Sequence, residues 1–284
     1  MLAAAKPLAD ATLTQDDLKY VAQVIYEQAG IVIREHKEAM ARGRLQRRVK
    51  ALGLNSISEY CAFLKRPEAS GEISELINAL TTNHTSFFRE RHHFDHLRGH
   101  ALPHLLNAGR RSRIRIWSSA CSSGEEPYSI ALSMLEVLPE AARLDVKILA
   151  SDIDPNMVKR AEAAVYGEEA VSPIPVELRK RWMEPVRDGA SMAWRPNAEV
   201  REMVTCRELN LMGPWPMKGR FDAIFCRNVA IYFDEPTQER LWGRYPACLE
   251  KGGRLYIGHS ERTSDPRFVT DGLTTYRLKE GAGA

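Results

Sequence analysis

The segment 114–131 constrains the fold of this chain more than any other part of the sequence. It opens with the apolar run 114–117, which is typical of a strand buried inside a parallel sheet. A turn of small residues then ends at Gly124, and Glu125 and the nearby Pro127 suit the first turn of a helix. A strand, a small-residue turn and a helix in this order predict the ligand-binding opening of a doubly wound α/β domain.

The chemistry of this turn indicates what it binds. A dinucleotide-binding fingerprint has three glycines at fixed spacing, which let a pyrophosphate approach the backbone. Here a single glycine, Gly124, is followed directly by two carboxylates that would repel a phosphate. S-adenosylmethionine has a cationic sulfonium and ammonium and no phosphate, so we expect this cofactor. A plain βα turn of a generic α/β protein is the alternative.

The run 146–154 predicts a second strand, and two acidic residues lie at its end. A carboxylate at the tip of this strand suits hydrogen bonds to the two hydroxyls of an adenosine ribose. We expect Asp152 to take this role, because Asp154 precedes a proline and suits the N-cap of the next helix.

Two further segments are expected at the same edge of the sheet. The apolar run 223–226 predicts another buried strand, and Arg227 and Asn228 follow it where α/β sheets bind ligands. Asn210 and Leu211 precede this strand and are suitably placed to contact an adenine ring.

The remaining sequence divides into regions. Residues 1–10 predict a loose tail, and repeated helical periodicity without a strand signal predicts a helical domain over 11–88. We expect residues 89–284 to form the α/β domain. Four prolines and the loss of the alternation between strands and helices predict an inserted β-subdomain at about 167–205, with short antiparallel strands around 191–194 and 200–205.

One predicted helix, at about 37–52, has an unbalanced charge. Its only acid is Glu38, against an excess of cations that includes Lys37, Arg44, Arg47, Arg48 and Lys50. A solvated face is the default interpretation of charges on a helix. An acidic partner would also explain such an excess, and the sequence leaves both interpretations open.

Composition excludes several classes of protein. Hydrophobic content of 44% and charged content of 27% are ordinary for a globular domain. A net charge of +3 is too weak to indicate nucleic acid. No apolar run approaches transmembrane length, and the N-terminus lacks the apolar core of a signal peptide. The five cysteines form no C-x-x-C pair, so we expect a reducing, cytoplasmic setting.

Four histidines recur at every fourth residue: His92, His96, His100 and His104. This spacing places them on one helix face, as in some metal sites. Pro103 interrupts the helix before the last histidine, and no cysteine pair accompanies them. We therefore interpret them as packing residues and expect no metal site.

Three motifs resemble those of the chemotaxis receptor methyltransferases, the CheR family. The turn at 120–131 reads Ala-Cys-Ser-Ser-Gly-Glu-Glu-Pro-Tyr-Ser-Ile-Ala, and 82–89 matches the family pattern T-N-x-T-x-F-F-R. The run 226–234 matches C-R-N-V-x-I-Y-F-D, with Ala230 at the variable position. The resemblance extends over about 14–278.

The resemblance implies a fold and a function. The fold is a Rossmann-like class I methyltransferase domain, preceded by a small all-helical, receptor-facing domain and interrupted by a small β-subdomain. The activity is methyl transfer from S-adenosylmethionine to glutamate side chains of chemoreceptors, which gives methyl esters and S-adenosylhomocysteine and serves sensory adaptation. The partner is the acidic helical cytoplasmic domain of a receptor. We expect no nucleic acid, no membrane insertion and a monomeric protein.

The resemblance also points to individual residues. It implies that Asn83, Thr85 and Arg89 reach the cofactor, and we infer Arg89 and Tyr232 as the catalytic pair. Arg44, Arg47 and Arg48 of the basic helix are then expected to face the substrate. With the residues considered above, the expected cofactor-binding set is Asn83, Thr85, Arg89, Ala120, Gly124, Glu125, Asp152, Asn210, Leu211, Arg227 and Asn228.

Methyl transfer to a glutamate needs little acid–base chemistry. A carboxyl with the ordinary pKa of about 4.3 is ionised at neutral pH, so it attacks the sulfonium methyl without a general base. Catalysis then rests on aligning the reactants and removing water between them. In this scheme Arg89 holds the carboxylate and Tyr232 orients it by a hydrogen bond.

Two other functions remain open from the sequence. A methyltransferase for nucleic acid, or for another protein, could use the same fold. A nucleic-acid enzyme would need a more basic surface and an aromatic pocket for a flipped base, which 227–232 lacks. A non-catalytic adaptor would bind cofactor or receptor without turnover, and the presence of Arg89 and Tyr232 argues against it.

Overall fold

The computed structural model describes residues 14–107, 113–189 and 191–281. The tail predicted at 1–10 therefore lies outside the described residues. The chain forms two compact units, of which the smaller comprises the described residues as far as Thr82 together with Tyr232–Asp234. The larger unit comprises the rest. The units divide earlier in the chain than the boundary predicted at residue 88.

The smaller unit is helical. It contains α1 (Gln15–Ala29), α2 (Glu38–Ala51), α3 (Ile57–Leu64) and α4 (Ser70–Leu80), with 3-10 turns at Glu35–Lys37 and Pro67–Ala69. Thr14 and Asp17 form a reciprocal cap at the start of α1, and Gly30 ends it with a φ of 71°. Fully buried side chains in this unit include Ile25, Leu45, Ile57, Tyr60 and Leu76.

The larger unit is built on a mixed sheet. In spatial order its strands are β6 (Val204–Glu208), β2 (Asp145–Asp152), β1 (Arg113–Ser118), β7 (Phe221–Cys226), β8 (Leu249–Ile257), β10 (Thr275–Leu278) and β9 (Phe268–Gly272). The pairs from β6 to β8 are parallel, whereas β10 pairs antiparallel with both β8 and β9. Every residue of β7 is buried, as expected for a central strand covered on both faces.

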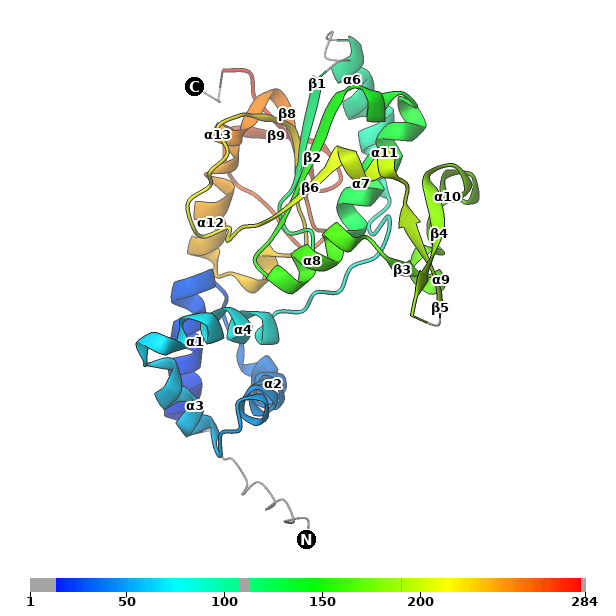
Figure 1. The fold of residues 1–284 in the computed structure, drawn as a ribbon. Coiled ribbons are helices and arrows are strands. Elements are labelled where there is room, and N and C mark those ends of the chain that lie inside the picture. The colour runs from blue at the N-terminus through cyan, green and yellow to red at the C-terminus, as the bar shows by residue number, and fades with distance from the viewer. Residues whose placement is uncertain (1–13, 108–112, 190, 282–284) are drawn as a thin grey trace. The chain divides into compact units, whose positions relative to one another are not determined.

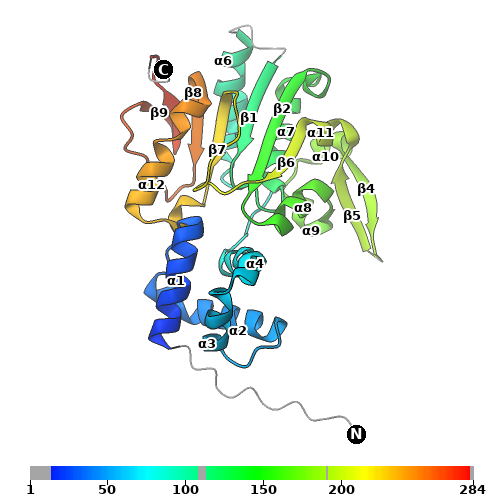
Figure 2. The same ribbon diagram turned by 60° about the vertical axis from the view of Figure 1, so that its left-hand side comes forward.

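Helices cover both faces of this sheet (Figures 1 and 2). They are α5 (His92–His96), α6 (Leu102–Asn107), α7 (Glu125–Val137), α8 (Pro155–Ala163), α11 (Ala198–Met203), α12 (Glu235–Trp242) and α13 (Tyr245–Cys248). A π-helical turn at Leu97–Ala101 joins α5 to α6, and 3-10 turns lie at Ala141–Arg143 and Ala230–Tyr232. Helices α6, α7 and α11 lie on one face, and α12 and α13 on the other. This is the predicted doubly wound α/β fold.

A small antiparallel sheet is inserted into the larger unit. Its order is β3 (Tyr166–Gly167), β5 (Ser191–Pro196), β4 (Met183–Asp188), and it is accompanied by α9 (Glu168–Val171) and α10 (Val176–Trp182). The prediction of a further antiparallel strand at 200–205 is wrong. Asn197 caps α11 by accepting a hydrogen bond from the Val200 amide, and Val204 begins β6, which runs parallel to β2 in the main sheet.

Candidate functional site

The parallel strands of the larger unit end at one edge of the sheet. The chain passes from β1 to β2 on one side, and β7 pairs with β1 on the other side. The strand order therefore reverses at β1, which makes this the topological switch point where open α/β sheets bind ligands. The turn after β1 and the tips of β2 and β7 all reach this edge.

The turn after β1 requires glycine at position 124. Gly124 has a φ of 101°, and a Cβ added there would lie 2.7 Å from the Tyr166 hydroxyl and 2.9 Å from the Cα of Ala161. Close packing on α8 thus accounts for the glycine. The neighbouring Ser122 also has a positive φ, 47°. The turn that leads into α7 is therefore fixed by its surroundings.

Asp152 lies at the tip of β2, as predicted, and its carboxylate is oriented by the protein. One oxygen accepts the Ser122 amide at 2.8 Å and the other accepts the Asp154 amide at 3.0 Å. Burial raises the pKa of Asp152, and these two hydrogen bonds oppose that effect. Because a carboxylate accepts up to about four hydrogen bonds, each oxygen keeps capacity for a ribose hydroxyl.

Asn83 connects the segment after the smaller unit to the ligand-binding edge of the sheet by two hydrogen bonds. Its side-chain amide donates to Asp154 at 2.9 Å, and its carbonyl accepts the Ser122 hydroxyl at 2.9 Å. Asp154 also caps α8, as predicted, by accepting the Asn156 amide. Thr85 follows in the same segment and is partly exposed.

The two glutamates that open α7 have different partners. Glu125, predicted to bind the cofactor, accepts a hydrogen bond from the Ser123 hydroxyl at 2.7 Å. Glu126 accepts the Ser118 hydroxyl at 2.7 Å and pairs with Arg227 at 2.8 Å. Sequence reasoning gave Glu126 no role in the site, although it lies inside the motif.

The side chain of Arg227 is buried inside the larger unit, to which the residue belongs. Its side chain is 2% exposed and lies between two carboxylates, Glu126 and Glu90, at 2.8 and 3.5 Å. It also donates to the main-chain oxygen of Arg89. Asn228 has a φ of 58°, and its side chain donates to Glu90 at 3.0 Å.

A buried carboxylate holds the loop after β7. Glu261 is 2% exposed and accepts the main-chain amides of Asn228 at 3.0 Å, Ala230 at 2.7 Å and Gly258 at 2.5 Å. Burial raises the pKa of Glu261, and these amides oppose that effect. The segment 258–261, Gly-His-Ser-Glu, also resembles the family, but sequence reasoning assigned Glu261 no role in the site.

Arg89 is partly exposed and has an unusual local backbone. Phe88 and Glu90 on either side have φ angles of 54° and 57°. The Arg89 guanidinium donates to the His84 carbonyl at 2.8 Å. The two phenylalanines before it are buried, with Phe87 2% and Phe88 9% exposed.

The predicted adenine contacts lie beyond β6. The Asn210 side-chain oxygen accepts the Met212 amide at 2.9 Å. Leu211 is buried and its carbonyl accepts the Trp215 indole at 3.2 Å. Ala120, in the turn after β1, is partly exposed.

Tyr232 belongs to the smaller unit. Its hydroxyl donates to the Thr82 carbonyl at 3.3 Å, and the Lys37 ammonium lies 5.0 Å from the centre of its ring. The backbone of this segment also pairs with the smaller unit, since Ile31 and Phe233 form an antiparallel bridge.

The basic residues of α2 differ in their partners. Arg44 donates to the carbonyls of Ala79, at 3.2 Å, and Thr81, at 2.5 Å. Arg48 makes two hydrogen bonds to Glu72, at 2.8 and 2.6 Å. Arg47 is exposed and has no ion pair within the part of the chain that the structure describes.

The histidine stripe packs against the β9–β10 connection. His93, which the stripe did not include, is fully buried and lies 2.8 Å from the Thr274 hydroxyl. His96 contacts the Tyr256 hydroxyl at 3.1 Å and the Asp271 carbonyl at 2.9 Å. These hydrogen bonds account for both side chains as packing residues.

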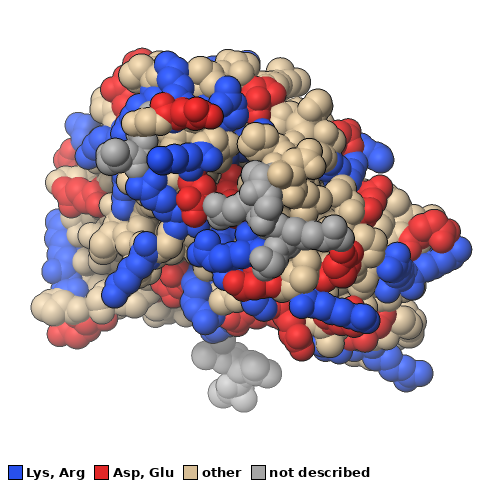
Figure 3. Space-filling model, turned by 90° about the horizontal axis from the view of Figure 1, so that it is seen from above, with Lys and Arg blue, Asp and Glu red and all other residues tan. Residues whose placement is uncertain are grey.

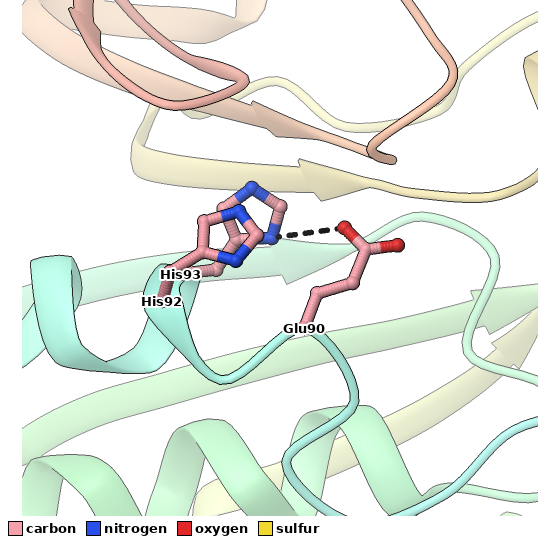
Figure 4. A group of neighbouring side chains, drawn as sticks. All are labelled: Glu90, His92 and His93. Carbon is pink, nitrogen blue, oxygen red and sulfur yellow. Dashed lines mark ion pairs between the residues drawn. The ribbon is translucent and has the colours of Figure 1, made fainter.

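Glu90, His92 and His93 bring possible metal-ligand atoms within 4.8 Å of one another (Figure 4). The His93 ring lies 3.6 Å from one Glu90 oxygen, and the Arg227 guanidinium lies 3.5 Å from the same oxygen. Burial, and then the charge of Arg227, lower the pKa of His93 to about 3. A cation beside Arg227 would be repelled, so this cluster is poorly suited to a metal.

Surface charge bears on the nucleic-acid alternative. On the face seen in Figure 3, Lys and Arg side chains are interspersed with Asp and Glu rather than gathered in one basic stripe.

Within the described ranges, no helix is both long and apolar enough to cross a lipid bilayer.

The edge around β1 fits S-adenosylmethionine. Asp152 has oxygens available for two ribose hydroxyls, and the Glu125 carboxylate in the first turn of α7 would attract a cationic ligand. The carboxylates of Glu125 and Glu126 lie in the first turn of a helix, where a phosphate would otherwise bind.

Comparison with known proteins agrees with this geometry. The family model "CheR methyltransferase, SAM binding domain" matches residues 83–275, and "CheR methyltransferase, all-alpha domain" matches 16–81. A probable chemotaxis protein methyltransferase of Rhizobium etli is 47% identical over 258 residues, covering 89% of this chain and 96% of that protein. The chemotaxis protein methyltransferase of Escherichia coli is 39% identical over 272 residues, covering 94% and 92%.

Proposed function

The chain belongs to the CheR family of chemotaxis methyltransferases, and on this premise we propose that it methylates glutamate side chains of chemoreceptors. The observation that carries the proposal is the Asp152 carboxylate, oriented at the switch point beside a turn that disfavours phosphate. S-adenosylmethionine, when bound, supplies a methyl group on a sulfonium that a carboxylate can attack. The enzyme is thus a methyltransferase with this cofactor.

We propose that this chain's own residues bind and align the reactants. Asp152 and Glu125, with Asn83 and Asn228, would hold the cofactor. Arg89 would hold the incoming carboxylate, and Tyr232 would orient it. One oxygen–carbon bond forms as one sulfur–carbon bond breaks, so the products are a methyl ester and S-adenosylhomocysteine and no proton moves. Alignment and exclusion of water then supply the rate enhancement.

We further propose that the smaller unit faces the substrate. Helix α2 carries exposed cations, and an acidic helical surface of a receptor would complement them. We propose a monomeric enzyme, since methyl transfer needs no residue from a second copy.

Tritium transfer tests this function. We expect label from the methyl group of S-adenosylmethionine to appear on a receptor cytoplasmic fragment and to be released by mild base, because esters hydrolyse there. Label that resists base would indicate methylation of nitrogen or of nucleic acid. Absence of transfer, with intact cofactor binding, would indicate an adaptor.

A further inference from the structure

We propose that Arg227 is a positioning residue, which holds the main chain at Arg89 in place, rather than a side chain that binds the cofactor. The inference rests on the proposed function, because it takes Arg89 as the catalytic cation. It also changes the role that the sequence suggests for Arg227.

The backbone around Arg89 needs external support. Phe88 and Glu90 both lie in the left-handed region, with φ angles of 54° and 57°. Residues other than glycine adopt this conformation only where the surrounding structure imposes it, and such positions cluster at functional sites. One such residue on each side of Arg89 indicates that the direction of this arginine is imposed by contacts.

Each of the three residues is tied to another part of the larger unit. The Phe88 amide donates to the Ser129 hydroxyl at 2.9 Å. The Arg89 carbonyl accepts a hydrogen bond from the Arg227 guanidinium. The Glu90 carboxylate accepts the Asn228 side chain at 3.0 Å. Arg227 therefore supplies the contact at Arg89 itself.

Glu90 is held as an anion beside Arg227. His259 Nδ1 lies 3.0 Å from one of its oxygens, and Arg227 lies 3.5 Å from the other. Burial raises the pKa of Glu90, but the hydrogen bonds of Asn228 and His259 and the charge of Arg227 outweigh burial and bring that pKa to about 2. The carboxylate therefore stays charged at physiological pH.

Arg227 also connects Arg89 to the cofactor turn. Its guanidinium pairs with Glu126 in the first turn of α7, and Glu126 accepts the hydroxyl of Ser118 at the end of β1. With its side chain 2% exposed, Arg227 directs both terminal guanidinium nitrogens to partners inside the unit, Glu126 and the Arg89 carbonyl. The arrangement fixes the distance between the turn and Arg89, which in-line methyl transfer requires.

The test is Arg227→Lys, which keeps the positive charge between the two glutamates but cannot reach Glu126, Glu90 and the Arg89 carbonyl together. We expect kcat to fall by about 10- to 100-fold, because small misplacements of a catalytic group have effects of this size. Affinity for S-adenosylhomocysteine, measured by calorimetry, should stay within about threefold. Arg254→Lys is the matched control, since both whole residues are 6% exposed and Arg254 pairs with Asp271, away from Arg89.

A double substitution separates this inference from the proposed function. In an Arg89→Ala background, Arg227→Lys should cause no further loss of kcat, because it acts through Arg89. Unchanged kcat in Arg227→Lys, or cofactor affinity that falls as far as kcat, would overturn the inference. Near-normal turnover of Arg89→Ala would instead overturn the proposed role of Arg89.

If Arg227→Lys does not fold, Glu90→Gln is the alternative test. It should give a smaller loss of kcat with unchanged cofactor affinity. Unchanged kcat in Glu90→Gln would equally overturn the inference.

Discussion

Charged side chains are satisfied differently in the two units. At the sheet edge of the larger unit, Glu126, Asp152 and Glu261 are buried, and each accepts hydrogen bonds from two or more groups. On α2 of the smaller unit, cations are exposed and without partners among the described residues: Arg42, Arg47 and Lys50. Buried, paired charges fix geometry, and their loss leaves a partner uncompensated. Exposed charges act at a distance and are screened by salt.

The largest expected effect is on turnover at Arg89. Replacement by Ala should lower kcat by about 10²- to 10³-fold, as for loss of one group that stabilises a transition state. Lys should restore only part of this, because it lacks the planar fork that fixes the angle of a carboxylate. Single-turnover assays at saturating cofactor measure both variants. Turnover near that of the unchanged protein would move the catalytic role to Tyr232.

Arg48 tests whether the burial of a charged pair, rather than the unit in which the pair lies, decides how much stability is lost when the pair is broken. It is in the smaller unit, yet it pairs with Glu72, whose side chain is 7% exposed. Arg48→Ala should cost about 2–3 kcal/mol of stability, because the carboxylate then keeps only the Tyr60 hydroxyl as a strong donor. Denaturation followed by circular dichroism measures this. A loss below about 0.5 kcal/mol would remove the distinction between buried and exposed cations on α2.

The pH dependence of stability tests the buried cluster of Glu90, His93 and Arg227 in the larger unit. The folded pKa of His93 is about 3, below its ordinary value of 6.5, so the unfolded chain binds a proton that the folded chain does not. Stability should therefore fall as the pH drops from about 6.5 towards 3, by at most about 1.4 kcal/mol per pH unit.

His93→Gln should flatten this dependence, and His104→Gln, at an exposed position of the same unit, should not. All five tryptophans lie in the larger unit, so tryptophan fluorescence reports its unfolding alone. Equal slopes in the unchanged protein and His93→Gln would contradict the prediction.

Asp152 should affect cofactor binding in addition to stability, because its carboxylate also accepts the Ser122 and Asp154 amides. Asp152→Ala should weaken S-adenosylhomocysteine binding at least about tenfold, because hydrogen bonds to a charged group contribute about 1.5–3 kcal/mol. Calorimetry measures the affinity. An unchanged affinity would move the ribose contact to Asp154 or remove the adenosine interpretation.

The smallest effect is expected for the exposed cations. Arg47→Glu should raise the apparent KM for the receptor by a few fold and reduce its salt dependence, while cofactor affinity stays constant. Lys19→Glu, an exposed reversal on α1, is the control. Reversal of Arg44 or Arg48 is less informative, because both bind other parts of the smaller unit. If KM responds to neither salt nor Arg47→Glu, these cations form only a solvated face.

Local signals in the sequence were sufficient for much of the scaffold. The cap at Thr14, the stop at Gly30 and the cap at Asp154 depend on residues within a few positions, so composition at those positions predicts them. The strand before the turn at 124 and the strand that ends at Asp152 follow from apolar runs. The prediction of a strand at 200–205 is wrong because the Asn197 cap begins a helix that includes residues 200–203 and leaves only Val204 and Thr205 to a strand.

Only the tertiary structure decided which charges pair. Glu90, Glu126 and Arg227 come from separate segments, and nothing local in any of them predicts the other two. The same holds for Tyr232–Asp234, which pack with the helical unit although the sequence around them belongs to the α/β fold. Apolar periodicity and caps are encoded locally, because helices and turns satisfy their own backbone groups. Pairing of buried charges depends on which strand ends meet at one edge of the sheet, and this only the assembled fold determines.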